Sequence, residues 1–398
     1  MTPQPRILYV GTFPPHPGGS GVANGYLLKG LHDAGYPIQV VTPSSPEAAG
    51  RADLVRRHFP AITLLETPAA KAVIEPWGEG YDNPEMQQEI AATLAACDAA
   101  AERRPPDLVL VGRVRSLEGV IPWSRQRGLP LAVSCHDGAI LLAGAHSPAA
   151  CRKGLDLLRQ VDLAVAPARH VAASLAARGI ANIVTVLNPV DSARFQPGAR
   201  DADLARRLDL KPDHVVVAHA SNMKPVKRAG DIVAAAARAV AADDRLVFLM
   251  IGDGPCRAAL ADGAREHGIA DYFRFTGWVD NEAIPDLLRL AHMALMPSRM
   301  EGLALAYLEA MATGLVLLAS DIPAAREVVA DGETGFLFPV GDSDAMADLI
   351  LRAAADPDLR QRVGARARAH VARHHRQGPA IERLRRALER LHGEQREA

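Results

Sequence analysis

Short apolar runs rich in valine, leucine and isoleucine recur along the chain, separated by longer stretches of helical character. In the first half, the runs predicted to form strands are Ile7–Val10, Ile38–Val41, Leu108–Val111, Leu131–Ser134, Leu163–Ala166 and Ile183–Leu187. They are hydrophobic throughout instead of alternating with polar residues, which is typical of parallel strands covered by helices on both faces. The pattern therefore predicts a doubly wound α/β domain.

The same pattern begins again after the extended segment Asn188-Pro189-Val190-Asp191. The second set of predicted strands is Val215–Ala220, Leu246–Ile251, Tyr272–Thr276, Met293–Met296 and Val316–Ala319. A chain of 398 residues also exceeds what one hydrophobic core usually supports. We therefore expect two domains, residues 1–190 and 191–370, followed by a C-terminal helix over 371–398 that can pack back on either domain, the N-terminal one included.

The composition is that of an ordinary globular protein, with 48% hydrophobic residues, 23% charged residues and a formal net charge of −1. It indicates no nucleic acid partner. The four cysteines lack CxxC spacing, so free thiols are expected instead of a zinc site. No apolar run approaches the roughly 18 residues needed to cross a bilayer, and the first residues lack the apolar segment of a signal peptide. We expect a cytoplasmic protein; the sequence leaves peripheral membrane contact and a homo-oligomer open.

Ligands of open parallel sheets bind beyond the carboxyl ends of the strands, so the strand-to-helix loops are where chemistry is expected. The first such loop runs from Gly11 to Gly21 and includes Gly18 and Gly19, with a helix expected to begin near Val22. Glycines there let backbone amides approach an anion at a helix N-terminus. We interpret the loop as a diphosphate cradle, with a flexible turn as the alternative.

Two other loops of the first half carry polar side chains at strand ends. Cys135-His136-Asp137-Gly138 follows one strand, and its histidine is either a cleft residue or a structural one. Gly112-Arg113-Val114-Arg115-Ser116 follows another. If that loop is extended, both arginines point to one side and form a planar donor pair suited to a carboxylate or phosphate. We take Arg113 and Arg115 as candidates for binding a small anionic acceptor, with solvated surface as the alternative.

In the second half, a basic loop precedes an alanine-rich helix expected to begin near Ala229. It reads Ser221-Asn222-Met223-Lys224-Pro225-Val226-Lys227-Arg228. Cations at a helix N-terminus are unfavourable unless an anion lies between them. The placement favours a phosphate site over a solvated basic turn.

The most specific segment runs from Pro297 to Gly314. A strand is expected to end near Met296 and a helix to begin near Leu303, with Gly314 as its C-terminal stop. Glu301 then precedes the helix, and Glu309 lies near its second turn. A carboxylate on a buried helix needs a partner, and the hydroxyls of a sugar and a ribose are suitable. The alternative is an amphipathic helix with two unrelated acids.

These residues together resemble glycosyltransferase family 4, whose members share the GT-B fold of two doubly wound Rossmann-like domains facing a central cleft. The family retains the anomeric configuration of the donor and carries a Glu-x7-Glu motif. The resemblance covers most of the chain in order and rests on Gly-Gly-Ser-Gly, His136, Asn188-Pro189-Val190-Asp191, Ile251-Gly252-Asp253-Gly254-Pro255, Phe275-Thr276-Gly277-Trp278-Val279, Glu301 with Glu309, and Glu333-Thr334-Gly335-Phe336-Leu337-Phe338-Pro339.

Within the family, Gly-Gly-Ser-Gly-Val and Ser-Asn-x-x-Pro-Val-Lys-Arg are most similar to the N-acetylglucosaminyl malate synthases of bacillithiol biosynthesis. Those enzymes carry His-Gly-Thr-Asp after their middle strand, whereas this chain has His136-Asp137-Gly138.

The resemblance implies a role for each matching position. Glu309 would hold the donor ribose, Glu301 the transferred sugar and Lys227 the diphosphate, while His136 would contact the sugar near its reacting carbon. The loop Gly18 to Gly21 would close over the phosphates. The catalytic set is then His136, Glu301 and Lys227, and the remaining donor contacts are Asn222, Lys224, Arg228, Val279, Gly302, Leu303, Ala304 and Leu305. Many members have an arginine at Asn222, and whether Lys224 or Arg228 replaces its charge stays open.

The predicted function is a retaining hexosyltransferase that moves a sugar from a nucleotide diphosphate sugar, with UDP favoured, to a small, anionic acceptor. We expect no cofactor and no metal, because no DxD cluster of the kind that holds magnesium stands at a strand end. Two alternatives are a GT-B sugar-nucleotide epimerase and a catalytically inactive nucleotide-sugar-binding protein. Asn222 and Ala304, which depart from the family pattern, keep the latter under consideration.

Overall fold

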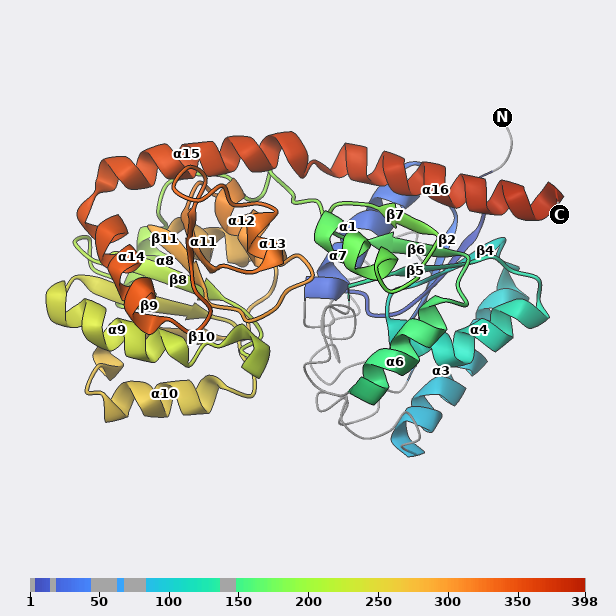
Figure 1. The fold of residues 1–398 in the computed structure, drawn as a ribbon, viewed down its shortest axis with the longest axis horizontal. Coiled ribbons are helices and arrows are strands. Elements are labelled where there is room, and N and C mark those ends of the chain that lie inside the picture. Colours follow the sequence, from blue (N-terminus) through green and yellow to red (C-terminus); the bar gives the residue numbers. More distant parts are fainter. Residues whose placement is uncertain (1–3, 15–18, 44–62, 68–83, 137–147, 398) are drawn as a thin grey trace. The chain divides into compact units, whose positions relative to one another are not determined.

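A computed structural model describes residues 4–14, 19–43, 63–67, 84–136 and 148–397 of the chain (Figure 1). The chain divides into two units, each treated by itself below. The first comprises Met1–Pro189 together with Gln377–Ala398, and the second comprises Val190–Arg376. Residues 371–376, which we expected to accompany the last helix, therefore lie in the second unit.

The first unit contains a sheet of seven strands in the order β3-β2-β1-β4-β5-β6-β7. All pairings are parallel. The strands are β1 (Ile7–Val10), β2 (Ile38–Pro43), β3 (Thr63–Thr67), β4 (Leu108–Val111), β5 (Leu131–Ser134), β6 (Leu163–Ala166) and β7 (Ile183–Thr185). The apolar pattern predicted each of these except β3, whose Thr-Leu-Leu-Glu-Thr sequence has polar residues at both ends.

The helices of the first unit lie between these strands and at the end of the chain. They are α1 (Gly19–Asp33), α3 (Pro84–Arg103), the 3-10 turn η1 (Val114–Ser116), α4 (Leu117–Gln126), α6 (Pro148–Leu158), α7 (Arg169–Ala176) and α16 (Gln377–Glu397). Helix α16 packs on α1, where a Cβ on Gly30 would lie 1.9 Å from Ile381 Cδ1. The Tyr36 hydroxyl donates to Glu389 of α16 at 2.6 Å. The last helix thus completes the core of the first unit.

The second unit contains a parallel sheet of six strands in the order β10-β9-β8-β11-β12-β13. They are β8 (Val215–Ala220), β9 (Leu246–Ile251), β10 (Phe273–Gly277), β11 (Met293–Met296), β12 (Val316–Ser320) and β13 (Phe336–Phe338). The three-residue strand β13 was missed because it is too short to give a pattern. Figure 1 shows this sheet between α9 and α10 on one side and α12 and α15 on the other.

The helices of the second unit follow its strands. They are α8 (Ala202–Arg207), the 3-10 turn η2 (Pro225–Lys227), α9 (Asp231–Ala242), α10 (Arg257–Glu266), the 3-10 turn η3 (Ala270–Tyr272), α11 (Ile284–Arg289), α12 (Leu305–Ala312), α13 (Pro323–Arg326), α14 (Ser343–Ala355) and α15 (Pro357–His374). In the part of the chain that the structure describes, no helix is long and apolar enough to cross a membrane.

Both sheets reverse their strand order at one point, between β1 and β4 in the first unit and between β8 and β11 in the second. The loops that leave two such strands diverge to opposite faces of the sheet and open a crevice at its carboxyl edge. Four of the loops selected from the sequence leave these strands. They are the loops after β1, β4, β8 and β11.

Candidate active site

The basic loop of the second unit leaves β8 and meets the loop that leaves β11. Lys227, on η2, places its ammonium 2.6 Å from Glu301 Oε1, and only 20% of its side chain and 10% of that of Glu301 are exposed. The backbones are joined as well, because Arg299 N donates to Val226 O at 2.9 Å. Two residues selected separately from the sequence therefore form one pair.

The other polar residues of this loop have different surroundings. Arg228 Nε donates to Asp231 at 2.6 Å, so its charge is already paired inside the first turn of α9. Asn222 Oδ1 is buried, with no hydrogen-bond partner among the described residues. The expected helix start near Ala229 is two residues early, because η2 precedes α9. Lys227 therefore links the basic loop to the β11 loop through its ion pair with Glu301.

Two glycines of a neighbouring loop allow the basic loop to pack closely. A Cβ on Gly252 would lie 2.1 Å from Ser221 O, and a Cβ on Gly254 would lie 1.9 Å from Asn222 O. Cys256 N also donates to Met223 O at 3.0 Å. This contact explains the Ile251-Gly252-Asp253-Gly254-Pro255 sequence physically, since any side chain at either glycine would push the basic loop away.

The segment from Glu301 to Glu309 leads from β11 into α12. The helix begins at Leu305, two residues later than expected, so Gly302, Leu303 and Ala304 form the loop before it. Gly314 follows the helix with φ +84°, a conformation that favours glycine. Glu301 therefore precedes the helix and Glu309 lies in its second turn.

Glu309 is buried, with 7% of its surface exposed. Burial raises the pKa of its carboxyl to about 7, and the nearby charge of Arg194 opposes this rise. Within the described ranges, no side chain or backbone group donates a hydrogen bond to that carboxyl. Because a buried carboxylate without donors is costly, the position is suited to a ligand that brings hydroxyl groups.

The remaining predicted donor contact of this unit, Val279, lies in the loop after β10. That strand is two positions from β8 in the sheet. Over the described stretches of the chain, no three His, Cys, Asp or Glu side chains gather as metal ligands.

In the first unit, α1 begins at Gly19 instead of near Val22. Gly19 and Gly21 therefore belong to its first turn, where helix geometry gives the backbone amides no intrahelical partner. Gly18 lies outside the described residues, as do Asp137 and Gly138. His136 follows β5; its Nε2 is buried with no described partner, and burial lowers its pKa to about 4. Its imidazole is therefore neutral near pH 7.

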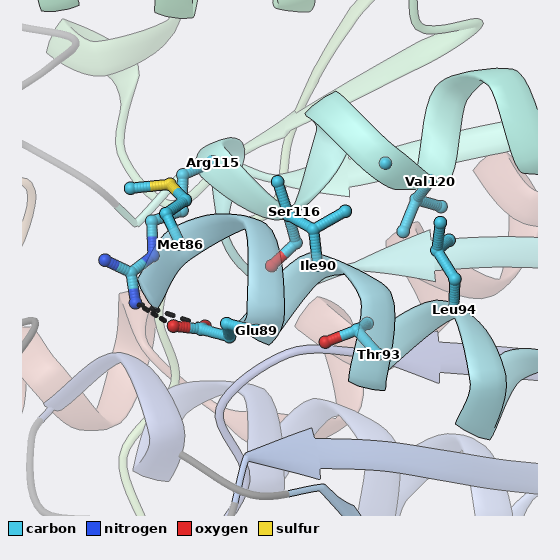
Figure 2. A pocket seen from close by; sticks show the side chains of 9 residues that line it. Met86, Glu89, Ile90, Thr93, Leu94, Arg115, Ser116 and Val120 are labelled. Atoms are coloured by element: carbon cyan, nitrogen blue, oxygen red, sulfur yellow. Dashed lines mark hydrogen bonds and ion pairs between the residues drawn. The ribbon is translucent and has the colours of Figure 1, made fainter. Parts of the chain in front are cut away.

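The two candidate acceptor arginines converge on one carboxylate of α3. Arg113 Nη1 and Arg115 Nη2 each lie 3.1 Å from an oxygen of Glu89, and the three side chains are 17%, 7% and 12% exposed. The expected extended loop is wrong, because Val114–Ser116 forms a 3-10 turn. Figure 2 shows Arg115 over Glu89 beside a hollow whose other lining residues include Met86, Ile90 and Val120.

Sequence reasoning did not select Glu89. It precedes the arginines by 24 and 26 residues, so no local spacing connects them. The triad carries a net charge of +1, since two cations share one carboxylate. An anion can therefore still be attracted to it, in competition with Glu89.

Two family profiles match consecutive parts of the chain. The profile described as Glycosyltransferase Family 4 matches residues 17–194, and the profile described as Glycosyl transferases group 1 matches residues 202–370. A D-inositol 3-phosphate glycosyltransferase from Streptomyces avermitilis is 30% identical over 408 residues, which covers 93% of this chain and 85% of the relative. The chain belongs to glycosyltransferase family 4. The resemblance seen in the sequence motifs is thereby confirmed, and the protein is a glycosyltransferase.

Other relatives match parts of this glycosyltransferase or its fold. An N-acetyl-α-D-glucosaminyl L-malate synthase from Bacillus anthracis is 32% identical over 191 residues, or 48% of this chain and 49% of the relative. Anabaena HepE, crystallised with UDP and glucose, superposes with a TM-score of 0.81 at 19% identity, covering 97% of this chain and all of that one. A sucrose-phosphate synthase from Thermosynechococcus elongatus superposes with a TM-score of 0.80 at 19% identity, covering 97% of this chain and 99% of that one. These structures share the GT-B fold, as expected.

Proposed function

We propose that this family 4 member is a retaining hexosyltransferase that moves a sugar from a UDP-sugar to a small anionic acceptor. The observation that supports donor binding is the ion pair of Lys227 with Glu301 at 2.6 Å, together with the burial of Glu309 on the helix that follows. Lys227 and Glu301 follow the carboxyl ends of β8 and β11, and Glu309 lies in the second turn of α12, the helix that comes next. A cation with two carboxylates suits a diphosphate linked to two polyols.

Each charged group has a defined part in donor binding. The diphosphate competes with Glu301 for Lys227, and the Glu301 carboxylate released from the ion pair accepts hydrogen bonds from the hydroxyls of the sugar. Glu309 accepts from the ribose, for which it must be ionised. HepE, which has the same fold, binds UDP and glucose. That complex supports the choice of UDP.

Departure of the diphosphate concentrates negative charge on its oxygens. Lys227 and the backbone amides around Gly302 to Ala304 stabilise that charge more strongly as it develops, which accelerates the reaction. We propose that no metal ion or cofactor takes part. In a same-face reaction the leaving phosphate oxygen accepts the acceptor's proton, so a neutral His136 positions the sugar and does not act as a base.

Arg113 and Arg115 are the groups we propose for the acceptor. Their guanidinium groups form a fork already directed at one carboxylate, Glu89, and a carboxylate or phosphate of the acceptor matches the same geometry. Two relatives are named for inositol 3-phosphate and for L-malate, and these two molecules carry a phosphate and carboxylates respectively. That similarity supports an anionic acceptor.

The test is incubation of the protein with a panel of UDP-sugars, each with and without D-myo-inositol 3-phosphate or L-malate, in EDTA. We expect UDP release that depends on the acceptor, and a product with the anomeric configuration of the donor by NMR. An inverted product overturns the retaining mechanism. An epimerised donor identifies an epimerase, and UDP binding without any turnover identifies an inactive binding protein.

A further inference from the structure

A buried histidine lies on β8, directly before the candidate phosphate loop. His219, on β8, is 1% exposed, and both of its ring nitrogens have partners. Nδ1 lies 2.8 Å from Leu295 O of β11, and Nε2 lies 2.7 Å from the Ser221 hydroxyl. A peptide carbonyl can only accept, so Nδ1 carries the proton.

The direction of the remaining bonds follows from this. Burial lowers the pKa of His219 to about 4, so the ring is neutral and Nε2 is an acceptor. The Ser221 hydroxyl therefore donates to Nε2, and its oxygen accepts from Met223 N at 3.0 Å. Three hydrogen bonds thus connect the backbone of β11 to the backbone of the basic loop.

The loop needs such an anchor because of its conformation. Met223 has φ +40°, a left-handed conformation that is unfavourable for a residue with a Cβ. Beyond Met223, Lys227 N donates to Lys224 O at 2.9 Å, which closes η2 and sets the direction of the Lys227 side chain. The conformation at Met223 therefore decides where Lys227 is presented.

The charges that act on His219 are those of the pair above it. Lys227 lowers its pKa and Glu301 raises it. An imidazolium in this place would repel Lys227 and attract Glu301. A neutral ring, in contrast, holds the loop without disturbing the pair.

We propose that His219 is a positioning residue that acts through Ser221 to hold Met223 in its left-handed conformation and thereby presents Lys227 to the leaving diphosphate. It does not touch the substrate itself. The role in turnover rests on the proposed function. The hydrogen-bond relay does not, and it is tested separately.

Two substitutions of His219 separate the two ends of the relay. The amide nitrogen of His219→Asn takes the place of Nδ1 and keeps the bond to Leu295, whereas the carbonyl oxygen of His219→Gln takes the place of Nε2 and still accepts from Ser221. We expect Gln to retain kcat within about threefold and Asn to lose about tenfold or more, with a smaller change in KM for the donor. Equal losses, or the reverse order, would overturn the proposal.

Measurements on the ligand-free protein test the relay without any donor. By 15N NMR we expect the Nδ1–H tautomer of His219 and no titration between pH 5.5 and 8. Ser221→Ala should speed hydrogen exchange at the Met223 amide about tenfold or more, while Ser221→Thr, which keeps the hydroxyl, should not. An Nε2–H tautomer or unchanged exchange contradicts the relay. If the Met223 amide is protected as expected but the protein binds no UDP, the relay stands. The role of His219 in turnover is then overturned, and so is the proposed function.

Discussion

The ammonium of Lys227 lies 2.6 Å from a carboxylate oxygen of Glu301, although 74 positions separate the two residues in the chain. They meet because β8 and β11 are neighbours in the sheet at its point of reversed order. Each neutralises the other while no donor is bound. A diphosphate must therefore draw the lysine away from Glu301, which leaves that carboxylate free to bind the sugar.

Replacement of this lysine should reduce turnover more than donor binding. For Lys227→Met we expect kcat to fall by about 100-fold or more, since the charge that Lys227 stabilises is larger in the transition state than in the bound donor. Calorimetry should show that the affinity for UDP falls by a smaller factor than kcat. Lys211→Met, at an exposed position before β8, is the control and should leave both unchanged. Normal turnover in Lys227→Met would transfer the role to Lys224.

The buried carboxyl of Glu309 should make stability depend on pH. Its pKa is raised from 4.5 to about 7 in the folded protein, so between these pH values the folded state keeps a proton that the unfolded state has lost. The contribution of Glu309 to the free energy of unfolding is therefore fully present below pH 4.5 and is lost as pH rises through 7, a difference of about 3 kcal/mol. The Glu309→Gln variant should lack this pH dependence. In urea unfolding, we expect it to be more stable than the wild type at pH 8 and equally stable near pH 4.

The same carboxyl should link donor binding to proton release. Because Glu309 is ionised when it accepts hydrogen bonds from the ribose, UDP binding at pH 6.5 should release part of a proton and become tighter as pH rises towards 8. Calorimetry in buffers of different ionisation enthalpy measures this release. Glu309→Gln should weaken binding and abolish the release of the proton. If proton release persists in that variant, another group is responsible.

A single methyl group at Gly254 should disable the donor site. Its Cβ would lie 1.9 Å from Asn222 O, a backbone atom that cannot move without displacing the basic loop. We expect Gly254→Ala to lose UDP affinity by about tenfold or more, with secondary structure retained by circular dichroism. Gly263→Ala in α10 is the matched control, since its Cβ would meet Val233 at an ordinary 3.7 Å. Equal behaviour of the two variants would mean that the loop does not depend on this contact.

Most strands of the fold could be predicted from the sequence because fully buried parallel strands are continuous apolar runs. The sequence did not reveal β3, an edge strand with polar ends, or β13, which has three residues. Of the candidate site, the pairing of Lys227 with Glu301 required the sheet order, which no local pattern contains. Glu89 and His219 were missed because their partners are set by tertiary packing.

The acceptor hypothesis depends on whether Arg113 and Arg115 can exchange Glu89 for a ligand. If they can, Glu89→Gln removes the internal competitor and should lower KM for an anionic acceptor severalfold, because a neutral amide attracts the guanidinium groups less. If the arginines only brace α3 against η1, the same change weakens a largely buried ion-pair network, lowers the melting temperature and leaves KM unchanged.

The arginines themselves are best replaced together with Glu89, since their removal alone would leave a carboxylate that is 12% exposed without a counter-charge. The triple variant Arg113→Ala, Arg115→Ala, Glu89→Gln should raise KM for the acceptor about tenfold or more while slow hydrolysis of the donor continues at the wild-type rate. Arg125→Ala, which removes the α4 partner of a more exposed ion pair with Asp162, is the control and should change neither value. L-Malate and its dimethyl ester, compared on the wild type, separate charge from shape: equal KM values for the two would contradict an arginine fork that recognises an anion.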